Sequence, residues 1–317
     1  MLAILLVTFP FFALVLCGYL AVRRGLLPTL AIPALNTFVL FFALPCLLYR
    51  FGATTPIERS LDPGVLSVYL LCALVLVGLT VWLTLSRRIR WKDAAFGALV
   101  AAFPNTGFMG VPLLVKLLGP QAAGPAIATI LVDLVVTSST CIALSQLDSA
   151  DEHGVRHAAG NALRGMLINP MPWSILLGAL SSASGVLPPA PVMQTISLLA
   201  DAASPTALFT IGAVLARSQM AHGEATAPLE YLPVVATKLL LHPLLVLVAG
   251  GLAIRFGLPL DAFALSVIVL VAALPSASNV VILAEKFAAD SGRIARIILV
   301  STALAFLTFS GAAALFI

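Results

Sequence analysis

Runs of apolar residues, each long enough to cross a membrane, follow one another along almost the whole chain with short polar gaps between them. About 20 consecutive apolar residues span the hydrocarbon core of a bilayer as a helix. A transmembrane barrel would instead show alternating strands of about 10 residues, a pattern that this sequence lacks. Only 9% of the residues are charged, against about 25% in soluble proteins. The sequence therefore predicts an all-α integral membrane protein.

Ten transmembrane helices are expected, five on each side of the least apolar gap, residues 147–165. This division predicts a first repeat at 1–147, a short linker at 148–165 and a second repeat at 166–317. The expected helices cover approximately residues 1–22, 33–51, 65–86, 94–118, 124–146, 166–187, 193–217, 230–254, 262–286 and 293–316.

The two halves resemble each other when one is shifted by 160 residues along the other. Apolar matches mean little in so hydrophobic a chain. Aligned prolines and glycines are more informative, because each marks a position with a specific backbone conformation. The aligned ones are Pro10, Gly18, Gly25, Pro28, Pro45 and Gly52 in the first half, and Pro170, Gly178, Gly185, Pro188, Pro205 and Gly212 in the second. Because each repeat has an odd number of helices, the second half is expected to insert in the inverted orientation.

The fourth and ninth expected helices both carry helix breakers near their middle. "LVAAFPNTG" (99–107) and "LVAALPSAS" (270–278) align with a shift of 171, so Pro104 corresponds to Pro275. Each proline lacks an amide hydrogen and interrupts the helix. Unpaired backbone groups at membrane depth are tolerated only inside protein or beside a wet cavity. Inverted repeats with a helix broken at the same place in each half are typical of secondary transporters.

Both breaks are rich in neutral hydrogen-bond donors. The helix that resumes after each break presents free N–H groups and the positive end of its dipole, which favour an anion. We therefore predict a binding site for a small organic anion such as a carboxylate. Its predicted residues are Pro104, Asn105, Thr106, Gly107, Pro275, Ser276, Ser278 and Asn279. The alternative interpretation is a pair of proline kinks that serve only helix packing.

Ionisable residues inside the expected helices form a second group of candidates. A charge at the middle of a membrane should face protein or water. We hypothesise that Asp133 and Lys238 pair and that one of them takes part in proton or substrate coupling; a purely structural ion pair is the alternative. The other candidates are His242, one turn after Lys238, Asp201, and Glu285, which a solvated helix end explains equally well.

Signatures of other classes are absent from the sequence. The four cysteines have no metal or disulfide spacing. No metalloprotease, hydrolase, P-loop or dinucleotide-binding motif occurs. The sequence thus predicts neither an enzyme nor a cofactor or metal, and transport without a nucleotide-binding domain would be secondary. The net charge of +4 requires no nucleic-acid partner, since loop arginines explain it.

Positive charge gathers in the loops that follow the odd-numbered helices. These loops hold ten lysines and arginines, and the loops after even-numbered helices hold three. The ten are Arg23, Arg24, Arg87, Arg88, Arg90, Lys92, Arg156, Arg164, Arg217 and Arg293. The positive-inside rule then predicts a cytoplasmic linker and both termini on the outer, periplasmic side of an inner membrane.

Residues 104–114, "PNTGFMGVPLL", resemble the fourth helix of the auxin efflux carrier family, whose plant members are the PIN auxin exporters. The resemblance covers essentially the whole chain. Looser matches are "FFALPCLLYRF" (41–51), "INPMPWSILLGAL" (168–180), "DAASPTALFTIGAVLA" (201–216) and "ALPSASNVVILAEKF" (273–287).

The resemblance implies ten helices in two inverted repeats, with the fourth and ninth broken and crossing. It also implies a scaffold of helices one, two, six and seven, often a homodimer, and a mobile transport domain of the others that moves like an elevator. Asn105 is expected to bind the substrate carboxylate. The wider fold is similar to the bile acid–sodium symporters, so the alternative is a sodium-coupled symporter, with a membrane sensor or scaffold as the second alternative.

The chain departs from the plant exporters in two ways. The gap between its halves is short, which resembles prokaryotic members, and Gly107-Phe108 replaces a Leu-Val pair, so the pocket shape differs. Bacterial relatives are described as permeases for malonate or similar dicarboxylates. The expected partners are therefore a small organic anion, proton or sodium as coupling ion, membrane lipid and a second copy of the chain.

Overall fold

The computed structural model describes residues 2–55, 62–148, 170–221 and 227–316, and the regular secondary structure within them consists of helices joined by short turns and loops. The elements of the first half are α1 (Leu2–Arg23), η1 (Thr29–Ala31), α2 (Ile32–Phe38), η2 (Val39–Ala43), α3 (Leu44–Thr54), α5 (Pro63–Thr84), α6 (Trp91–Ala102), η3 (Thr106–Gly110), α7 (Val111–Leu118), η4 (Pro120–Ala122), α8 (Ala123–Val132), η5 (Asp133–Thr137), α9 (Ser138–Ser145) and η6 (Gln146–Asp148). Those of the second half are α11 (Pro170–Ser184), α12 (Ala190–Ala221), α13 (Pro228–Ala236), η7 (Thr237–Leu241), α14 (His242–Arg255), α15 (Ala262–Ala273), α16 (Asn279–Lys286) and α17 (Ser291–Ala313).

Seven helices among the described residues are long and apolar enough to cross a membrane. They are Ile4–Arg23, Thr29–Thr54, Pro63–Thr84, Pro120–Ser145, Ala190–Met220, Pro228–Arg255 and Ser291–Ala313. The other three expected spans correspond to α11 and to two interrupted helices, α6–η3–α7 and α15–α16. These findings confirm the all-α membrane class. The predicted linker, with Arg156 and Arg164, lies outside the described residues, as does Arg59.

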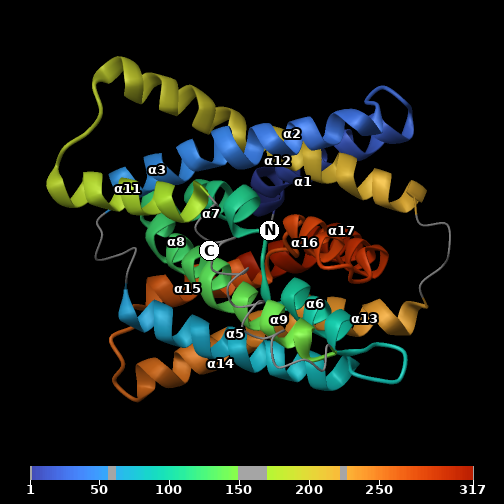
Figure 1. Cartoon of the computed structure of the whole chain (residues 1–317). Helices are drawn as coiled ribbons and strands as arrows, with labels where there is room; N and C mark the ends of the chain where they lie inside the picture. The colour runs from blue at the N-terminus through green and yellow to red at the C-terminus, as the bar shows by residue number, and fades with distance from the viewer. Residues whose placement is uncertain (1, 56–61, 149–169, 222–226, 317) are drawn as a thin grey trace.

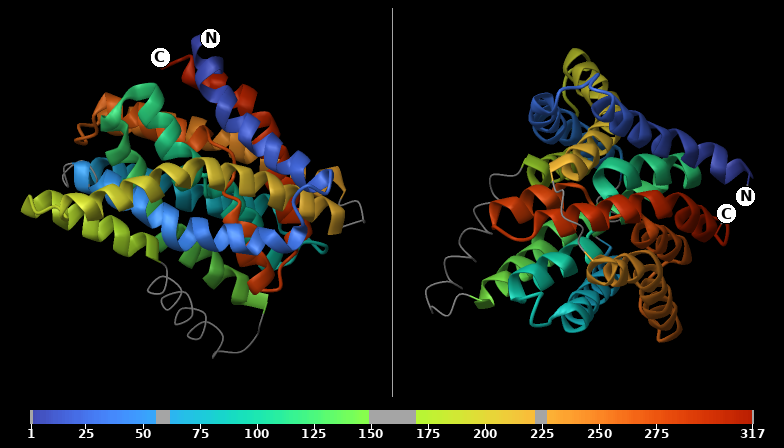
Figure 2. Two further views of the ribbon diagram at one scale, coloured as in Figure 1. Left: turned by 90° about the horizontal axis from the view of Figure 1, so that it is seen from above. Right: turned by 90° about the vertical axis from the view of Figure 1, so that its right-hand side faces the viewer.

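The helices pack as two groups. Figure 1 shows α2, α3, α11 and α12 along one side of the molecule, and α5 and α14 along the opposite side. Within the first group α12 packs on α1 and α3, and α11 packs on α3; within the second, α5 contacts α6 and α14 contacts α15. Both views of Figure 2 place the chain termini close together, where α1 runs beside α17.

Glycines allow the closest helix contacts of the first group. A β-carbon added to Gly18 of α1 would lie 1.8 Å from the carbonyl oxygen of Phe209 in α12, and one added to Gly212 would lie 1.8 Å from that of Val15. Between α3 and α11, a β-carbon on Gly178 would lie 2.6 Å from the carbonyl oxygen of Tyr49. These distances leave no room for a side chain, so the helix backbones touch directly.

The position of Arg293 differs from the one assumed in the count of loop charges. It was expected in a loop, but it lies in the first turn of α17 and only 2% of it is exposed. Its Nε donates to the carbonyl oxygen of Glu230 at 2.8 Å and its Nη1 to that of Asp93 at 2.9 Å. Arg293 therefore joins the starts of α13, α6 and α17 and does not contribute a solvated loop charge.

Candidate functional site

The first interrupted helix, α6–η3–α7, breaks where the sequence predicts. α6 stops at Ala102, and residues 103–105, here called the first break, are not helical. Phe103 is extended, with φ −105° and ψ 94°. The chain then resumes as the π-helical turn η3, whose first residue is Thr106. Pro104 explains the interruption, because it supplies no amide hydrogen and displaces the preceding turn.

The second interrupted helix, α15–α16, breaks at the position that aligns with the first break. α15 ends at Ala273, residues 274–278 form the second break, and α16 begins at Asn279. The backbone amide of Ser276 donates a hydrogen bond of 3.4 Å to Oγ of Ser301 in α17. Pro275 causes this break as Pro104 causes the first.

The two breaks lie against each other and share backbone hydrogen bonds. The amide of Asn105 donates to the carbonyl oxygen of Pro275 at 2.9 Å, and the amide of Ala277 donates to that of Phe103 at 3.0 Å. Pro104 and Ser276 form an isolated antiparallel bridge. Segments about 170 residues apart thus satisfy part of each other's backbone, which removes some of the cost of broken helices in an apolar environment.

Several polar groups at the paired breaks are buried without a partner. Asn105, Thr106 and Ser276 are each less than 5% exposed. Among the described residues, the side-chain oxygens of Thr106, Ser276 and Asn279 have no hydrogen-bond partner. The amide hydrogens of Gly107 and Phe108, in the first turn after the break, also find no acceptor in the described parts of the chain. These groups remain available to a ligand.

A small cavity of about 30 Å³ lies beside the first break. Its lining includes Pro104, Asn105, Thr106, Gly107 and Asn279 of the predicted site, whereas Pro275, Ser276 and Ser278 do not line it. The remaining lining is apolar and comes from Leu44, Phe103, Phe108, Ile130, Leu134, Met171 and Ala277. The cavity is therefore about the size of one water molecule and is lined by both polar and apolar groups.

Asp133 lies in a buried cluster of hydroxyl groups. It is fully buried in the π-helical turn η5 and accepts hydrogen bonds at 3.1 Å from Tyr69 and from Thr137. Sequence reasoning missed both partners. Thr137 follows Asp133 by four residues, so the helical spacing could have identified it. Tyr69 comes from α5, a distant part of the chain, and no sequence pattern indicates this contact.

Lys238 and His242 form the other part of this cluster. Both are fully buried, and Nζ of Lys238 lies 3.1 Å from Nδ1 of His242 and donates to the carbonyl oxygen of Ala272 at 3.0 Å. The ring of His242 lies 5.9 Å from that of Tyr69, between centroids. Ala272 lies three residues before Pro275, so Lys238 binds a carbonyl at the end of the interrupted helix.

The predicted direct pair between Asp133 and Lys238 is not formed. No salt bridge within 4.0 Å joins them, although both belong to the same cluster. The physical reason is that each already has nearer partners: hydroxyl groups for the carboxylate, and an imidazole and a carbonyl for the ammonium. Asp133 and Lys238 therefore lie in one cluster without a direct bond, each held by its own polar partners.

The last two ionisable candidates lie away from the paired breaks. Asp201 of α12 forms a salt bridge of 2.7 Å with Arg50 of α3, and its side chain is 67% exposed. Glu285 is exposed at the end of α16. Within the described residues, no group of three or more His, Cys, Asp or Glu side chains could hold a metal ion.

The chain is similar over most of its length to proteins named as transporters. It is 29% identical over 308 residues to a "Putative malonate transporter" of Rhizobium meliloti (strain 1021), covering 95% of this chain and 92% of that protein. It is 28% identical to the "Uncharacterized transporter YfdV" of Escherichia coli (strain K12), covering 88% of this chain and 86% of that one.

A shorter similarity reaches the plant proteins. The chain is 28% identical over 127 residues to "Auxin efflux carrier component 3a" of Oryza sativa subsp. japonica, which covers 37% of this chain and 19% of the plant protein. This match confirms the resemblance to auxin efflux carriers that residues 104–114 indicated. The sequence pattern of the family described as "Membrane transport protein" matches residues 3–312. The chain therefore belongs to the membrane transport protein family.

Proposed function

We propose that this protein is a secondary active transporter of a small organic anion that binds at the paired breaks. The observation that carries this proposal is the set of buried oxygens without partners on Thr106, Ser276 and Asn279. A buried polar group without a partner costs about 1–3 kcal/mol. A ligand that bonds to these groups removes that cost, and the hydroxyl of Thr106, which lines the cavity, can donate to a carboxylate.

An anion can bind here without a cationic side chain. No lysine or arginine lines the cavity. The free backbone amide hydrogens of Gly107 and Phe108 and the side-chain amide of Asn105 supply the donors, and the start of the resumed helix supplies partial positive charge. We expect a mono- or dicarboxylate, and the similarity to a protein named for malonate makes malonate the first compound to test.

Alternating access would let this small cavity admit a larger ligand. Leu44 of α3 and Met171 of α11 line it from the first helix group, and the other lining residues come from the two breaks, η3, α8, η5 and α16. We propose that α1–α3, α11 and α12 form the scaffold and the other helices the transport domain. A rigid displacement of the second group relative to the first would then separate the two sides of the cavity, as in an elevator mechanism.

The helix contacts support two inverted five-helix repeats, 1–147 and 166–317, joined by the linker at 148–165. The sequence alignment pairs Gly18 with Gly178 and Gly52 with Gly212. These four glycines lie in two contacts, α1 with α12 and α3 with α11. The shift of 160 residues converts one contact into the other, as a repeat requires. We propose ten membrane crossings, a cytoplasmic linker, both termini outside, and a homodimer in the inner membrane.

Asp133 is our candidate for coupling transport to protons. We propose that it exchanges a proton during the transport cycle, because it is a fully buried carboxylate in the same cluster as Lys238, which holds the end of α15. The Asp133→Asn variant should transport with a flatter dependence on external pH. Asp261→Asn, which changes an exposed aspartate at the start of α15, is the matched control. An unchanged pH profile in Asp133→Asn excludes this role.

Uptake of radiolabelled malonate, acetate and indole-3-acetate into proteoliposomes tests the function. An imposed pH or sodium gradient identifies the coupling ion, and a sodium-only response would favour the symporter alternative. Asn105→Ala should lower uptake by about 10-fold or more, the value of one hydrogen bond to a charged group. Asn36→Ala, a change in α2 outside the cavity, should have no effect. No response to any anion or gradient would favour a sensor.

A further inference from the structure

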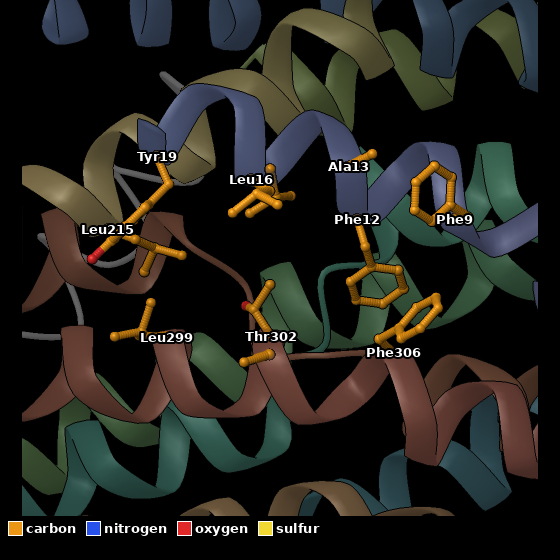
Figure 3. A pocket seen from close by; sticks show the side chains of 11 residues that line it. Phe9, Phe12, Ala13, Leu16, Tyr19, Leu215, Leu299, Thr302 and Phe306 are labelled. Carbon is orange, nitrogen blue, oxygen red and sulfur yellow. The ribbon is translucent and has the colours of Figure 1, made fainter. Parts of the chain in front are cut away.

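An apolar groove separates α1 from α17. Figure 3 shows Phe9, Phe12, Leu16 and Tyr19 of α1 facing Phe306 and other residues of α17 across it. Its volume is about 400 Å³, within the range of about 300–1,000 Å³ typical of small-molecule sites. Phe9 and Leu16 are 60% and 56% exposed, so the groove opens to the surroundings of the protein. No predicted site residue lines it.

The groove continues into a polar cavity at one end. Leu215 and Leu299 line both spaces, and Tyr19, which lines the groove, donates its hydroxyl hydrogen to Gln219 of the polar cavity. The polar cavity has a volume of about 380 Å³, and two arginines line it, Arg23 at the end of α1 and Arg296 in α17. The combined space is therefore amphipathic along its length, with cationic groups at one end only.

The length of the apolar part matches one leaflet of a bilayer. Phe9 and Tyr19 are ten residues apart on α1, which is about 15 Å at ~1.5 Å per residue. This is half of the hydrocarbon core of about 30 Å. Arg23 lies one further turn along the helix, at the depth expected of a headgroup. An acyl chain thus fits the groove while its phosphate reaches the arginines.

We propose that this groove binds one phospholipid with an anionic headgroup, its acyl chain between α1 and α17 and its phosphate beside Arg23 and Arg296. The charge pattern selects this occupant. A helix of a second copy could fill the apolar part, but two cationic side chains at one end favour an occupant that carries negative charge next to an apolar chain. The proposal is independent of the transported anion, because the groove shares no residue with the cavity at the breaks.

Native mass spectrometry of the full-length protein in detergent tests the proposal. Phosphatidylglycerol and phosphatidylcholine with identical acyl chains are added at equal concentration. We expect one phosphatidylglycerol to be retained in preference to phosphatidylcholine, with each arginine contributing about fivefold to the preference. Arg23→Gln with Arg296→Gln should abolish it, Arg23→Lys with Arg296→Lys should retain it, and Arg87→Gln, an exposed arginine outside the groove, should leave it unchanged.

A second variant tests the apolar part. Ala303→Phe places a ring in the groove and should reduce retention of both lipids, whereas Ala190→Phe, at an exposed site in α12, should not. Elution of each variant from size-exclusion chromatography at the wild-type volume establishes that it is folded. Equal retention of the two lipids by the wild type would overturn the proposal. So would an Ala303→Phe protein that changes its oligomeric state while keeping its lipid, since the groove would then be a protein interface.

Discussion

Glycine occurs both between α1 and α12 and after the first break, but its surroundings differ. A β-carbon on Gly18 or Gly212 would lie 1.8 Å from a backbone carbonyl oxygen of the opposite helix. A β-carbon on Gly107 would meet only the side chain of Leu44, at 3.7 Å. The first two glycines therefore set the distance between helix axes, whereas Gly107 leaves space beside a cavity. Direct backbone contact sets the spacing of α1 and α12, whereas the region after the first break is arranged around a small cavity with polar groups in its lining.

The largest expected effect comes from adding a methyl group to the helix contact. Gly212→Ala should destabilise the protein by about 3 kcal/mol or more, because the clash is with backbone and neither helix can yield locally. Thermal unfolding in detergent measures the change. Gly78→Ala in α5, which has nothing within 4 Å, should instead be neutral or stabilising by up to about 1 kcal/mol. Wild-type stability of Gly212→Ala would show that the helices are not held at this distance.

Removing the lysine that supports the second break should have the next largest effect. Lys238→Met leaves the carbonyl of Ala272 and Nδ1 of His242 without their partner, which should cost about 1–3 kcal/mol. Thermal unfolding again gives the value. Lys286→Met, at an exposed position in α16, is the control and should change little. If both variants unfold alike, the breaks do not depend on this polar contact.

Thr106→Val should separate stability from binding at the first break. The hydroxyl of Thr106 is buried without a partner, so its removal should leave stability unchanged or raise it. Anion affinity should fall by about fivefold, equivalent to one hydrogen bond of about 1 kcal/mol. In the control Thr129→Val, a bond of 2.8 Å to Ala126 is lost, so stability should fall. A Thr106→Val protein with full affinity would remove this hydroxyl from the binding site.

The smallest effect is expected at Gly107. Gly107→Ala adds one methyl group in ordinary contact with Leu44, so the protein should fold with stability within about 1 kcal/mol of the wild type. Uptake of indole-3-acetate should fall several-fold more than uptake of malonate, because one methyl group discriminates by about 1–3 kcal/mol at most. Equal losses for both anions would indicate that Gly107 does not shape the pocket.

The sequence predicted the helical membrane class and the positions of both breaks because each depends on local properties. Hydropathy identifies an apolar helix, and Pro104 and Pro275, together with the small and polar residues that follow them, mark where two of these helices are interrupted. The sequence could not show that Asn105 donates its amide hydrogen to Pro275, since that bond joins distant segments. Only the matching "LVAAFP" and "LVAALP" suggested that the two segments are related.

The buried charges were harder to interpret. Asp133 and Lys238 were correctly expected inside the protein, but opposite charge alone suggested a direct pair. The actual partners, such as Tyr69 and the carbonyl of Ala272, depend on which helices pack together. Arg293 was misjudged because its position between two hydrophobic runs resembles a loop, whereas its guanidinium group binds backbone carbonyls at two helix starts.

The length of α12 has a consequence for the surrounding bilayer. Its 32 residues extend about 48 Å at ~1.5 Å per residue, which exceeds the hydrocarbon thickness of about 30 Å. The helix must therefore tilt strongly, extend into the headgroup region, or both. Because α12 packs on α1 and α3, its tilt fixes theirs as well. We expect membrane thickness to act on the whole first group of helices, so that a thicker bilayer changes the angle at which that group stands in the membrane.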